Sequence, residues 1–356
     1  MRRSLIAAAA LTSTALLAAC GGGSPSTGAS GDAAASGAAG QLVVYTNSGS
    51  DGRDAWLTDK AKAAGFDIQV VQAGGGDTKN KLINEVNNPV ADVAYGLNNF
   101  YFEQVVKAGA IEPYNPSWAD KVDLEMGDAT GAGNYWPIVQ QGIVLVYNPA
   151  GKAGVPNDWP DLWTKSEWKE RYETPASVTG ATTQLVLSGI LTRYTDPNGE
   201  MGISADGWKA VEQFFANGNP AEKDVDMFKR LADGTVDAGQ MFTSGIPGRE
   251  EQYKIKVAQA TPEVGVPYAI EQVALVKGSK NKEQAQKFID WFGAAELQSE
   301  WSKQFTTMPA NKDAIANADP AVVKLHEGLK QQNIDWAFVG ENIDGWVEKI
   351  TLEYLG

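Results

Sequence analysis

The sequence predicts an α/β protein with two lobes, in which each lobe has a sheet with a parallel core and two crossover strands join the lobes. Three observations indicate this fold. Three strand–loop–helix units follow one another over residues 41–108, and such units build a parallel sheet with helices on its faces. Two long apolar segments, 136–147 and 265–276, flank a stretch with its own helices. The chain of 356 residues also exceeds what a single hydrophobic core usually supports.

The first twenty residues are typical of an export signal. A basic start precedes an apolar run that is short for a bilayer span, and small residues precede Cys20. Cys20 is the only cysteine, and its place after Leu-Ala-Ala is the pattern of a bacterial lipoprotein signal. A plain secretory signal with an incidental cysteine is the alternative. We therefore expect a signal peptide over 1–19, a lipid on Cys20, and an extracytoplasmic location on the periplasmic side or outer face of the membrane.

The rest of the chain is predicted to consist of a linker and two lobes. Residues 20–40 are almost entirely Gly, Ala, Ser, Thr and Pro, so they have little to bury and are expected to act as lipid anchor and flexible linker. We expect the first part of lobe 1 at 41–140, an inserted lobe 2 at 141–265, and the second part of lobe 1 with the C-terminal helices at 266–356. Two lobes joined by two strands can close on a ligand.

Lobe 1 is predicted to alternate strands and helices. The strands are expected at 42–46, 66–71 and 91–95, and the helices at 52–64, 79–87 and 100–108. Ligands of parallel sheets bind beyond the carboxyl ends of the strands, so the loops after these strands should line a cleft. These loops carry Ser48, Ser50, Gly76, Thr78, Asn98 and Asn99.

Lobe 2 is predicted to carry an anion site at a helix start. Its helices are expected near 159–171, 182–194, 205–216 and 225–232, with a strand at 236–242. The loop 177–184 opens an apolar helix, whose first N–H groups and positive dipole end suit phosphate, phosphonate or carboxylate. Ordinary N-capping by Ser and Thr is the alternative. Similar polar loops at 48–50, 74–78 and 243–245 favour an anion site, because several such loops can converge on one ligand.

The composition limits the classes of function. The formal net charge is −14, which argues against nucleic acid as a partner because binding it needs a basic surface. With one cysteine and one histidine, we expect no metal site, no cofactor and no catalytic residue. His326 lies in a charged segment and is expected at the surface. Trp159, Trp163 and Trp168 are expected to pack in the core.

Six short motifs mark the body of the chain, at 43–46, 89–93, 146–149, 276–281, 285–290 and 308–311. Their order and spacing resemble the solute-binding proteins of bacterial ABC importers, of the two-lobe periplasmic type (type II). The resemblance covers essentially all of residues 41–356. It implies a monomer that captures a small ligand between its lobes and delivers it to an ABC permease in the cytoplasmic membrane.

Within that superfamily the chain resembles the branch that binds ferric iron, thiamine and 2-aminoethylphosphonate. Iron binders commonly hold the metal with adjacent tyrosines, whereas residues 241–244 here read Met-Phe-Thr-Ser. Thiamine binders resemble 92–99, but no tryptophan for stacking lies in 209–290. Phosphonate binders resemble 71–82 best. A small phosphonate or phosphate-bearing ligand similar to 2-aminoethylphosphonate is therefore the first expectation, with thiamine or thiamine phosphate and then ferric iron as alternatives.

The resemblance also implies roles for individual residues. The anionic end of the ligand would be received by lobe 2 and enclosed by lobe 1, and polar or aromatic side chains would hold the rest. The lobe 2 candidates are Ser177, Thr179, Gly180, Thr182 and Ser244, the lobe 1 candidates are Ser48, Ser50, Gly76 and Thr78, and the remaining candidates are Tyr95, Asn98, Asn99, Tyr135, Gln140 and Tyr268.

Two other classes of protein remain as alternatives. An exported enzyme would need a nucleophile–base pair, and none is visible in the sequence, although a buried carboxylate pair is compatible with it. A structural lipoprotein or adhesin would show repeats, and none is visible either.

Overall fold

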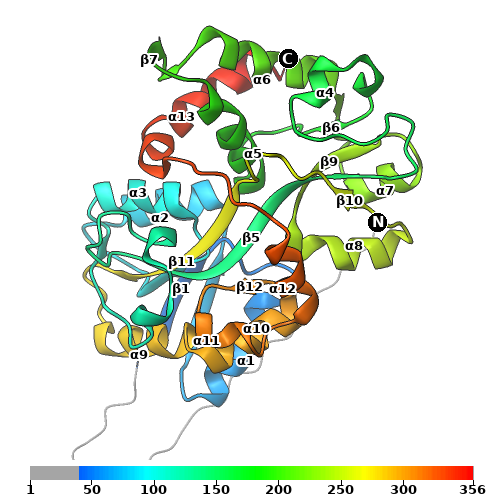
Figure 1. Cartoon of the computed structure of the whole chain (residues 1–356). Helices are drawn as coiled ribbons and strands as arrows, with labels where there is room; N and C mark the ends of the chain where they lie inside the picture. The colour runs from blue at the N-terminus through cyan, green and yellow to red at the C-terminus, as the bar shows by residue number, and fades with distance from the viewer. Residues whose placement is uncertain (1–39, 356) are drawn as a thin grey trace, which may run out of the picture. The chain divides into compact units, whose positions relative to one another are not determined.

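The computed structural model describes residues 40–355, which belong to one compact unit (Figure 1). The predicted signal peptide, Cys20 and all but the last residue of the predicted linker lie outside the described residues. No helix within residues 40–355 is long and apolar enough to cross a membrane. We use lobe 1 for residues 40–140 and 266–355 and lobe 2 for residues 141–265, following the predicted division.

The predicted parallel core of lobe 1 is confirmed. Strand β1 (Leu42–Thr46) pairs in parallel with β2 (Ile68–Gln72) on one side and with β3 (Val93–Tyr95) on the other. Helices α1 (Arg53–Ala63), α2 (Gly75–Asn84) and α3 (Asn99–Lys107) follow these strands in turn. Helix α1 buries Leu57 and Ala61, which lie four residues apart and so share one face of the helix. The carboxyl ends of the three strands therefore meet at one edge of the sheet.

The two predicted crossover strands are β5 (Trp136–Tyr147) and β11 (Tyr268–Val276), which pair with each other in antiparallel fashion. Strand β11 continues along β3 and along the short β4 (Ile111–Glu112) in lobe 1. The first half of β5 pairs with β11 and β12 (Met308–Pro309), and its second half pairs with β9 (Ala238–Phe242) and β10 (Ala258–Gln259) of lobe 2. All twelve residues of β5 are buried, so it runs through the core of both lobes (Figure 1).

Lobe 2 is mainly helical around the second half of β5. Parallel pairing occurs there between β6 (Glu173–Thr174) and β8 (Asn219–Pro220) and at the bridge from Tyr172 to Ala238, whereas β9 and β10 are antiparallel to β5. The remaining elements are α4 (Asp161–Thr164), α5 (Ala181–Leu191), β7 (Thr195–Glu200), α6 (Ala205–Asn217), α7 (Met227–Ala232), the 3-10 turn η5 (Thr243–Gly245) and α8 (Ile246–Tyr253).

The continuous helix predicted near 159–171 is wrong. Only α4 and a 3-10 turn, Ser166–Trp168, form there, and Lys165 between them is extended (φ −104°, ψ 125°). The reason is the burial of two tryptophans, Trp159 at 2% and Trp168 at 1% exposure. Two positions nine residues apart in an α-helix lie about 180° apart around the helix axis. A single helix would therefore point these two rings to opposite faces. Both are core residues, as predicted, and Trp163 packs against the same core in a partly buried position.

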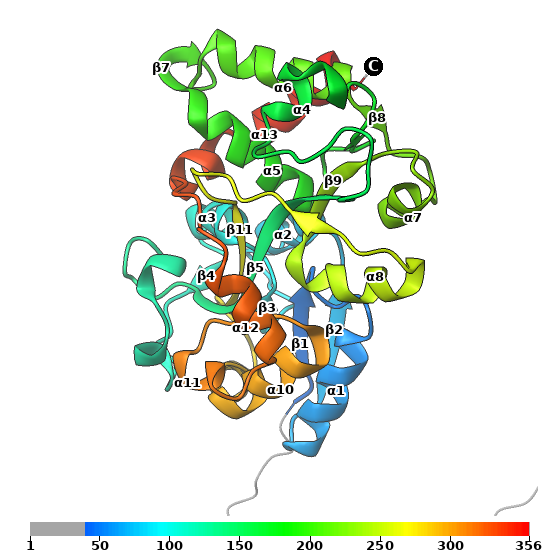
Figure 2. The same ribbon diagram turned by 45° about the vertical axis from the view of Figure 1, so that its right-hand side comes forward.

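The C-terminal third covers lobe 1 and then reaches lobe 2 (Figures 1 and 2). Helix α10 packs Trp301 against Phe292 of α9 and Trp56 of α1, with the Trp301 and Phe292 ring centroids 5.7 Å apart. Helix α13 places Trp336 beside Phe100 of α3 and also packs on α5 of lobe 2. The bounds are α9 (Lys282–Phe292), α10 (Ala295–Phe305), α11 (Lys312–Ile315), α12 (Pro320–Glu327) and α13 (Trp336–Glu353).

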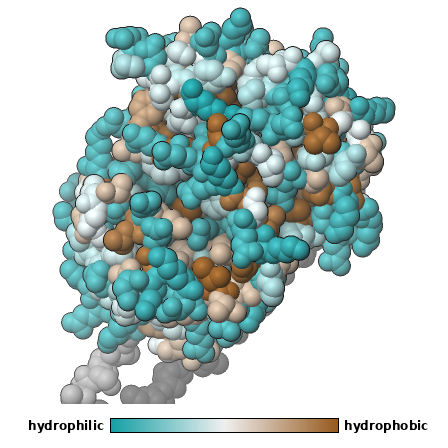
Figure 3. Space-filling model, in the orientation of Figure 1, coloured by the Kyte–Doolittle hydropathy of each residue, from teal (hydrophilic) through white to brown (hydrophobic). Residues whose placement is uncertain are grey.

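His326 is buried, so its expected surface position is wrong. It lies in α12 with 9% exposure, and its ring is edge-on to the ring of Tyr268, 5.5 Å away between centroids. The charged neighbours in α12 that indicated a surface helix, Lys324 and Glu327, are exposed. On the face drawn in Figure 3, hydrophilic residues cover most of the surface, with small apolar patches between them.

Candidate functional site

A pocket of about 160 Å³ lies between lobe 1, lobe 2 and the two crossover strands. The loops after β1 and β3 form its lobe 1 wall, as predicted from the carboxyl ends of parallel strands. The first turns of α5 and the end of β9 form its lobe 2 wall. Its lining residues are Asn47, Ser48, Ser50, Arg53, Gly96 and Asn98 from lobe 1, Gln141, Ile143, Ala269 and Glu271 from the crossover strands, and Ala181, Thr182, Leu185 and Phe242 from lobe 2.

Arg53 provides the positive charge of this pocket. It is the first residue of α1 and is 7% exposed. Its Nη1 is 3.4 Å from the carbonyl oxygen of Ser50 and 3.4 Å from Oδ2 of Asp51, which is largely exposed. Its Nε has no hydrogen-bond partner among residues 40–355. A buried guanidinium with long contacts and an unused N–H retains the capacity to bind an anion strongly.

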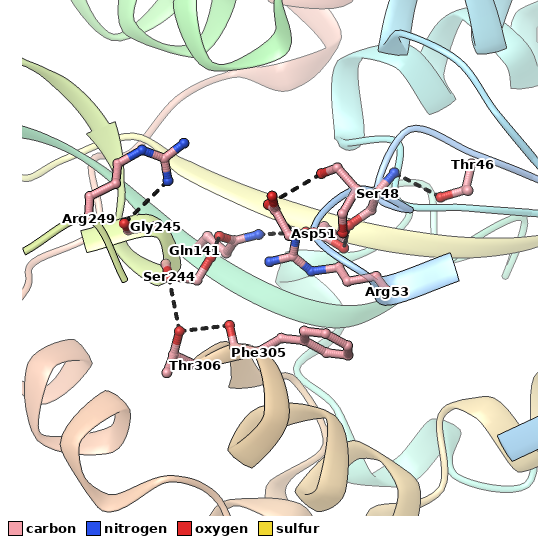
Figure 4. Close-up of polar contacts among 12 residues, drawn as sticks. Thr46, Ser48, Asp51, Arg53, Gln141, Ser244, Gly245, Arg249, Phe305 and Thr306 are labelled. Carbon is pink, nitrogen blue, oxygen red and sulfur yellow. Dashed lines mark hydrogen bonds and ion pairs between the residues drawn. The ribbon is translucent and has the colours of Figure 1, made fainter. Parts of the chain in front are cut away.

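Glu271 provides a negative charge in the same pocket. The Ser48 hydroxyl donates to Oε2 at 2.8 Å, and Gln141 Nε2 donates to Oε1 at 2.5 Å. Gln141 in turn accepts a hydrogen bond from the hydroxyl of Ser244 (Figure 4). Burial raises the pKa of Glu271, and the charge of Arg53 and these hydrogen bonds oppose the rise. The loop after β1, both crossover strands and lobe 2 thus share one hydrogen-bond network.

Strand β11 presents Glu271 to the pocket and the next residue, Gln272, to the other side of the sheet. The pairing of β11 with β5 shifts register between Glu271 and Gln272. Gln272 points the other way, where its Nε2 donates to the carbonyl of Met126 at 2.6 Å and lies 3.2 Å from Oδ1 of Asn99. Successive side chains of a strand alternate between faces, and a bulge changes their direction locally. Glu271 and Gln272 are therefore adjacent in the sequence but form their hydrogen bonds on different sides of the sheet.

The first turn of α5 brings unsatisfied N–H groups to the pocket wall. Its N-cap is Gly180, in an extended conformation and without a side-chain cap. Thr182 lines the pocket, whereas Ser177 and Thr179 are exposed and bond to each other, with their hydroxyl oxygens 3.0 Å apart. Because a glycine N-cap offers no oxygen to the first N–H groups, these groups remain available to a ligand.

A second cavity of about 440 Å³ adjoins the pocket, and Arg53 and Phe242 line both. Ser244 and Arg249 are on its lobe 2 side (Figure 4). Arg249 is already paired, because its Nε lies 3.0 Å from Oδ2 of Asp226. No group of three histidine, cysteine, aspartate or glutamate residues that could hold a metal ion occurs within the described part of the chain.

The structure brings some of the predicted residues together and places others elsewhere. Ser48, Ser50, Asn98 and Thr182 line the pocket, and Ser244 lines the adjoining cavity. Several others donate hydrogen bonds within the fold: Thr78 to the Thr46 carbonyl at 3.4 Å, Asn99 to the Met126 carbonyl at 2.9 Å, Tyr135 to Glu103 at 2.5 Å and Gln140 to the Pro309 carbonyl at 3.2 Å. Gly76 lies in the first turn of α2, Tyr95 is fully buried, and the Tyr268 hydroxyl is 3.2 Å from Nδ1 of His326.

Sequence reasoning missed four of the lining residues that carry polar groups, namely Asn47, Arg53, Gln141 and Glu271. One of them had a visible signal, because Glu271 is the only charged residue in the apolar segment 265–276. A charge in a segment that is otherwise built for the core has to be paired, solvated or functional. Arg53 had no such signal, since it follows a polar loop and precedes an ordinary helix.

Comparisons with known proteins place this fold among binding proteins. The model of a family described as bacterial extracellular solute-binding protein matches residues 55–328. A protein of Sinorhizobium fredii named probable ABC transporter periplasmic-binding protein y4fP is 34% identical over 88% of this chain and 86% of its own length. A Salmonella typhimurium protein named putative 2-aminoethylphosphonate-binding periplasmic protein is 22% identical over 86% of this chain and 90% of its own.

Solved structures share the fold at low sequence identity. The periplasmic binding protein P5PA is 22% identical, with a TM-score of 0.71 over 88% of this chain and 99% of its own. Iron-bound HitA from Pseudomonas aeruginosa is 18% identical, with a TM-score of 0.72 over 87% and 99%. AfuA from Actinobacillus pleuropneumoniae with fructose-6-phosphate bound is 20% identical, with a TM-score of 0.71 over 88% and 99%. The α/β fold expected from the sequence is thereby confirmed.

Proposed function

Because this chain belongs to the bacterial extracellular solute-binding protein family, we propose that its pocket captures a small ligand that bears a phosphonate or phosphate group. The protein is the solute-binding component of an ABC import system, which gives it a small-molecule ligand and a membrane permease as partners. Its family works outside the cytoplasm. We further propose that a lipid on Cys20 keeps it beside the permease.

The observation that carries the ligand class is the buried guanidinium of Arg53. Arg53 has an Nε without a hydrogen-bond partner among residues 40–355, and it lines a pocket that is also lined by the hydroxyl-bearing residues Ser48, Ser50 and Thr182. A tetrahedral anion with three oxygens can accept from a guanidinium, from hydroxyls and from the N–H groups of a helix start at the same time. The first turn of α5 supplies those N–H groups. In this proposal Ser177, Thr179 and Gly180 shape that turn rather than contact the ligand.

The relatives support the same class. The Salmonella typhimurium relative is named for 2-aminoethylphosphonate, and AfuA was solved with a sugar phosphate. Thiamine phosphate would also place a phosphate on Arg53 and would have the ring of Phe242 for contact.

Ferric iron is less well supported by the geometry. Tyr95, Tyr135 and Tyr268 do not line the pocket.

A thermal-shift series on the purified chain tests the proposal. The ligands are 2-aminoethylphosphonate, fructose 6-phosphate, thiamine phosphate and ferric citrate. A true ligand at a hundred times its Kd stabilises the fold by about 2.7 kcal/mol. Arg53→Met should weaken binding about tenfold to a hundredfold, because it removes a charge-assisted hydrogen bond. Arg249→Met is the matched control, since Arg249 lines only the adjoining cavity. Its affinity should stay within about threefold of the wild-type affinity.

Two results would contradict the proposal. One is stabilisation by ferric iron alone that a chelator abolishes. The other is unchanged affinity for every phosphonate and phosphate in Arg53→Met, because the anionic group would then bind elsewhere.

A further inference from the structure

The pocket contains two buried charges of opposite sign that form no direct ion pair with each other within 4.0 Å. Arg53 is 7% exposed and Glu271 is 6% exposed, and both line the same cavity. Within residues 40–355, the ion pair of Arg53 is with Asp51, and Glu271 forms none within 4.0 Å. Burying a carboxylate without a partner of opposite charge in direct contact is costly, so the position of Glu271 is expected where a ligand supplies that partner.

We propose that Glu271 binds a cationic nitrogen of the ligand, so that the pocket selects a zwitterion with an amine and a phosphonate or phosphate over an anion of equal size without the amine. This inference rests on the proposed function and narrows its ligand class. Arg53 and the α5 N-terminus receive the anionic end, and Glu271 receives the amine.

The hydrogen bonds of Glu271 leave room for that amine. An ionised carboxylate accepts about four hydrogen bonds. The two found here come from neutral donors, the Ser48 hydroxyl at 2.8 Å and the Gln141 amide at 2.5 Å. These donors hold the carboxylate in place from two elements, the loop after β1 and the strand β5. An ammonium group that enters the pocket can use the remaining acceptor sites, and a charged donor binds a carboxylate more strongly than a neutral one does.

The pKa of Glu271 gives the proposal a second observable. Burial raises this pKa, and Arg53 from α1, Ser48 and Gln141 oppose the rise. Burial raises the pKa of the Tyr95 hydroxyl on β3, and the charge of Glu271 adds to this rise. A bound ammonium favours the ionised carboxylate. Binding of an amine-bearing ligand should therefore release protons at a pH at which free Glu271 is partly protonated.

The test compares two ligands that differ only in the amine. Isothermal titration calorimetry measures 2-aminoethylphosphonate and propylphosphonate, in which a methyl group replaces the ammonium, on the full chain. The variants are Glu271→Gln, which keeps the shape and an amide oxygen as acceptor, and Glu263→Gln, an exposed control. We expect wild type to prefer the amine at least about tenfold. Glu271→Gln should lose most of that preference through weaker binding of 2-aminoethylphosphonate, whereas propylphosphonate, which has no ammonium, should not bind more weakly. Glu263→Gln should behave as wild type.

The other possible outcomes distinguish a failure of the role of Glu271 from a failure of the proposed function. Equal affinity of wild type for both ligands would overturn the role of Glu271 and leave the proposed function intact. An equal loss of affinity for both ligands in Glu271→Gln would show that Glu271 only supports the fold of the pocket. This result would also overturn the proposed role of Glu271. If neither compound bound to wild type, the proposed function itself would fail. Titrations in buffers of different ionisation enthalpy should show proton release with the amine in wild type only, beyond the amount seen with propylphosphonate.

Discussion

Acid should weaken this fold through His326. Its ring is buried between Tyr268 of β11 and Thr243 of η5, with Nε2 3.4 Å from the hydroxyl of Thr243. Burial lowers the pKa of His326 to about 4, against 6.5 for a free side chain. Between these two values the unfolded chain binds more protons than the folded chain. The contribution of His326 is therefore complete above the unfolded pKa and is lost as the pH falls toward the folded pKa.

The magnitude follows from the two pKa values. Between about pH 7.5 and about pH 4.5, proton linkage gives a loss of about 2.5 kcal/mol in the free energy of unfolding. For a folded unit of this size, that loss corresponds to about 4 °C in Tm. Glu173 and Glu271 act in the opposite direction over part of this range, because burial raises the pKa of both carboxyls. The quantity to measure is thus the difference between wild type and a variant without the imidazole.

The assay is thermal and urea unfolding of wild type and His326→Gln across this pH range. Glutamine can still hydrogen-bond to Tyr268 and Thr243, but it does not titrate. We expect the variant to be less stable at neutral pH by a fixed amount and to lose about 2.5 kcal/mol less than wild type on acidification. Parallel stability curves for the two proteins would refute the reasoning, since they would mean that His326 does not change its protonation between the folded and unfolded chains.

Two further predictions concern stability at neutral pH. Gly76→Ala should raise the free energy of unfolding by about 0.5–1 kcal/mol, because it lies in α2 and its Cβ would meet no atom within 4 Å. Gly75→Ala next to it should instead destabilise the fold, since its Cβ would lie 2.5 Å from a buried tyrosine ring; equal effects at the two positions in urea unfolding would contradict this. Arg171→Met should cost about 3–5 kcal/mol, because it leaves the buried carboxylate of Asp237 without its partner. Lys229→Met, which breaks an exposed pair, should produce no measurable change in the same assay, and a comparable loss there would argue against burial as the cause.

The fold was predictable where the sequence pattern is strong over several residues. The strands β1, β5 and β11 are runs of apolar and β-branched residues, and their positions agree with the prediction to within a few residues. Helix α2 was expected to begin at Lys79 but begins at Gly75. Two adjacent glycines usually indicate a loop. Here Gly75 and Gly76 form the first turn of α2. The ring of Tyr101 leaves no space for a side chain at Gly75, so this glycine serves packing, which only the tertiary structure shows.

The site was predictable only where a local rule applies. The rule that ligands bind beyond the ends of parallel strands selected Ser48, Ser50 and Asn98, and all three line the pocket. The partnership of Ser48 with Glu271 joins positions 223 residues apart, and that of Gln141 with Glu271 joins positions 130 apart. No local pattern encodes such contacts. They depend on the pairing of β11 with β5. The sequence indicates the two strands, but it does not show which of their residues lie opposite each other.

Strand β5 also limits how this protein can be redesigned. Its pairing passes from β11 to β9 within one step of the chain, since Gly142 is opposite Tyr268 and Ile143 is opposite Phe242. A change in the angle between the lobes would bend β5 near that step and β11 near its counterpart, and it would also involve α13, which packs on both lobes. Gln141, Ile143 and Glu271 belong to the same two strands and line the pocket. Substitutions at these positions would therefore change both the stiffness of the connection between the lobes and the ligand selectivity, which matters to anyone who builds a fluorescent biosensor from this protein. Substitutions of Ser50 and Thr182, which lie in a loop and a helix, would change the ligand selectivity alone.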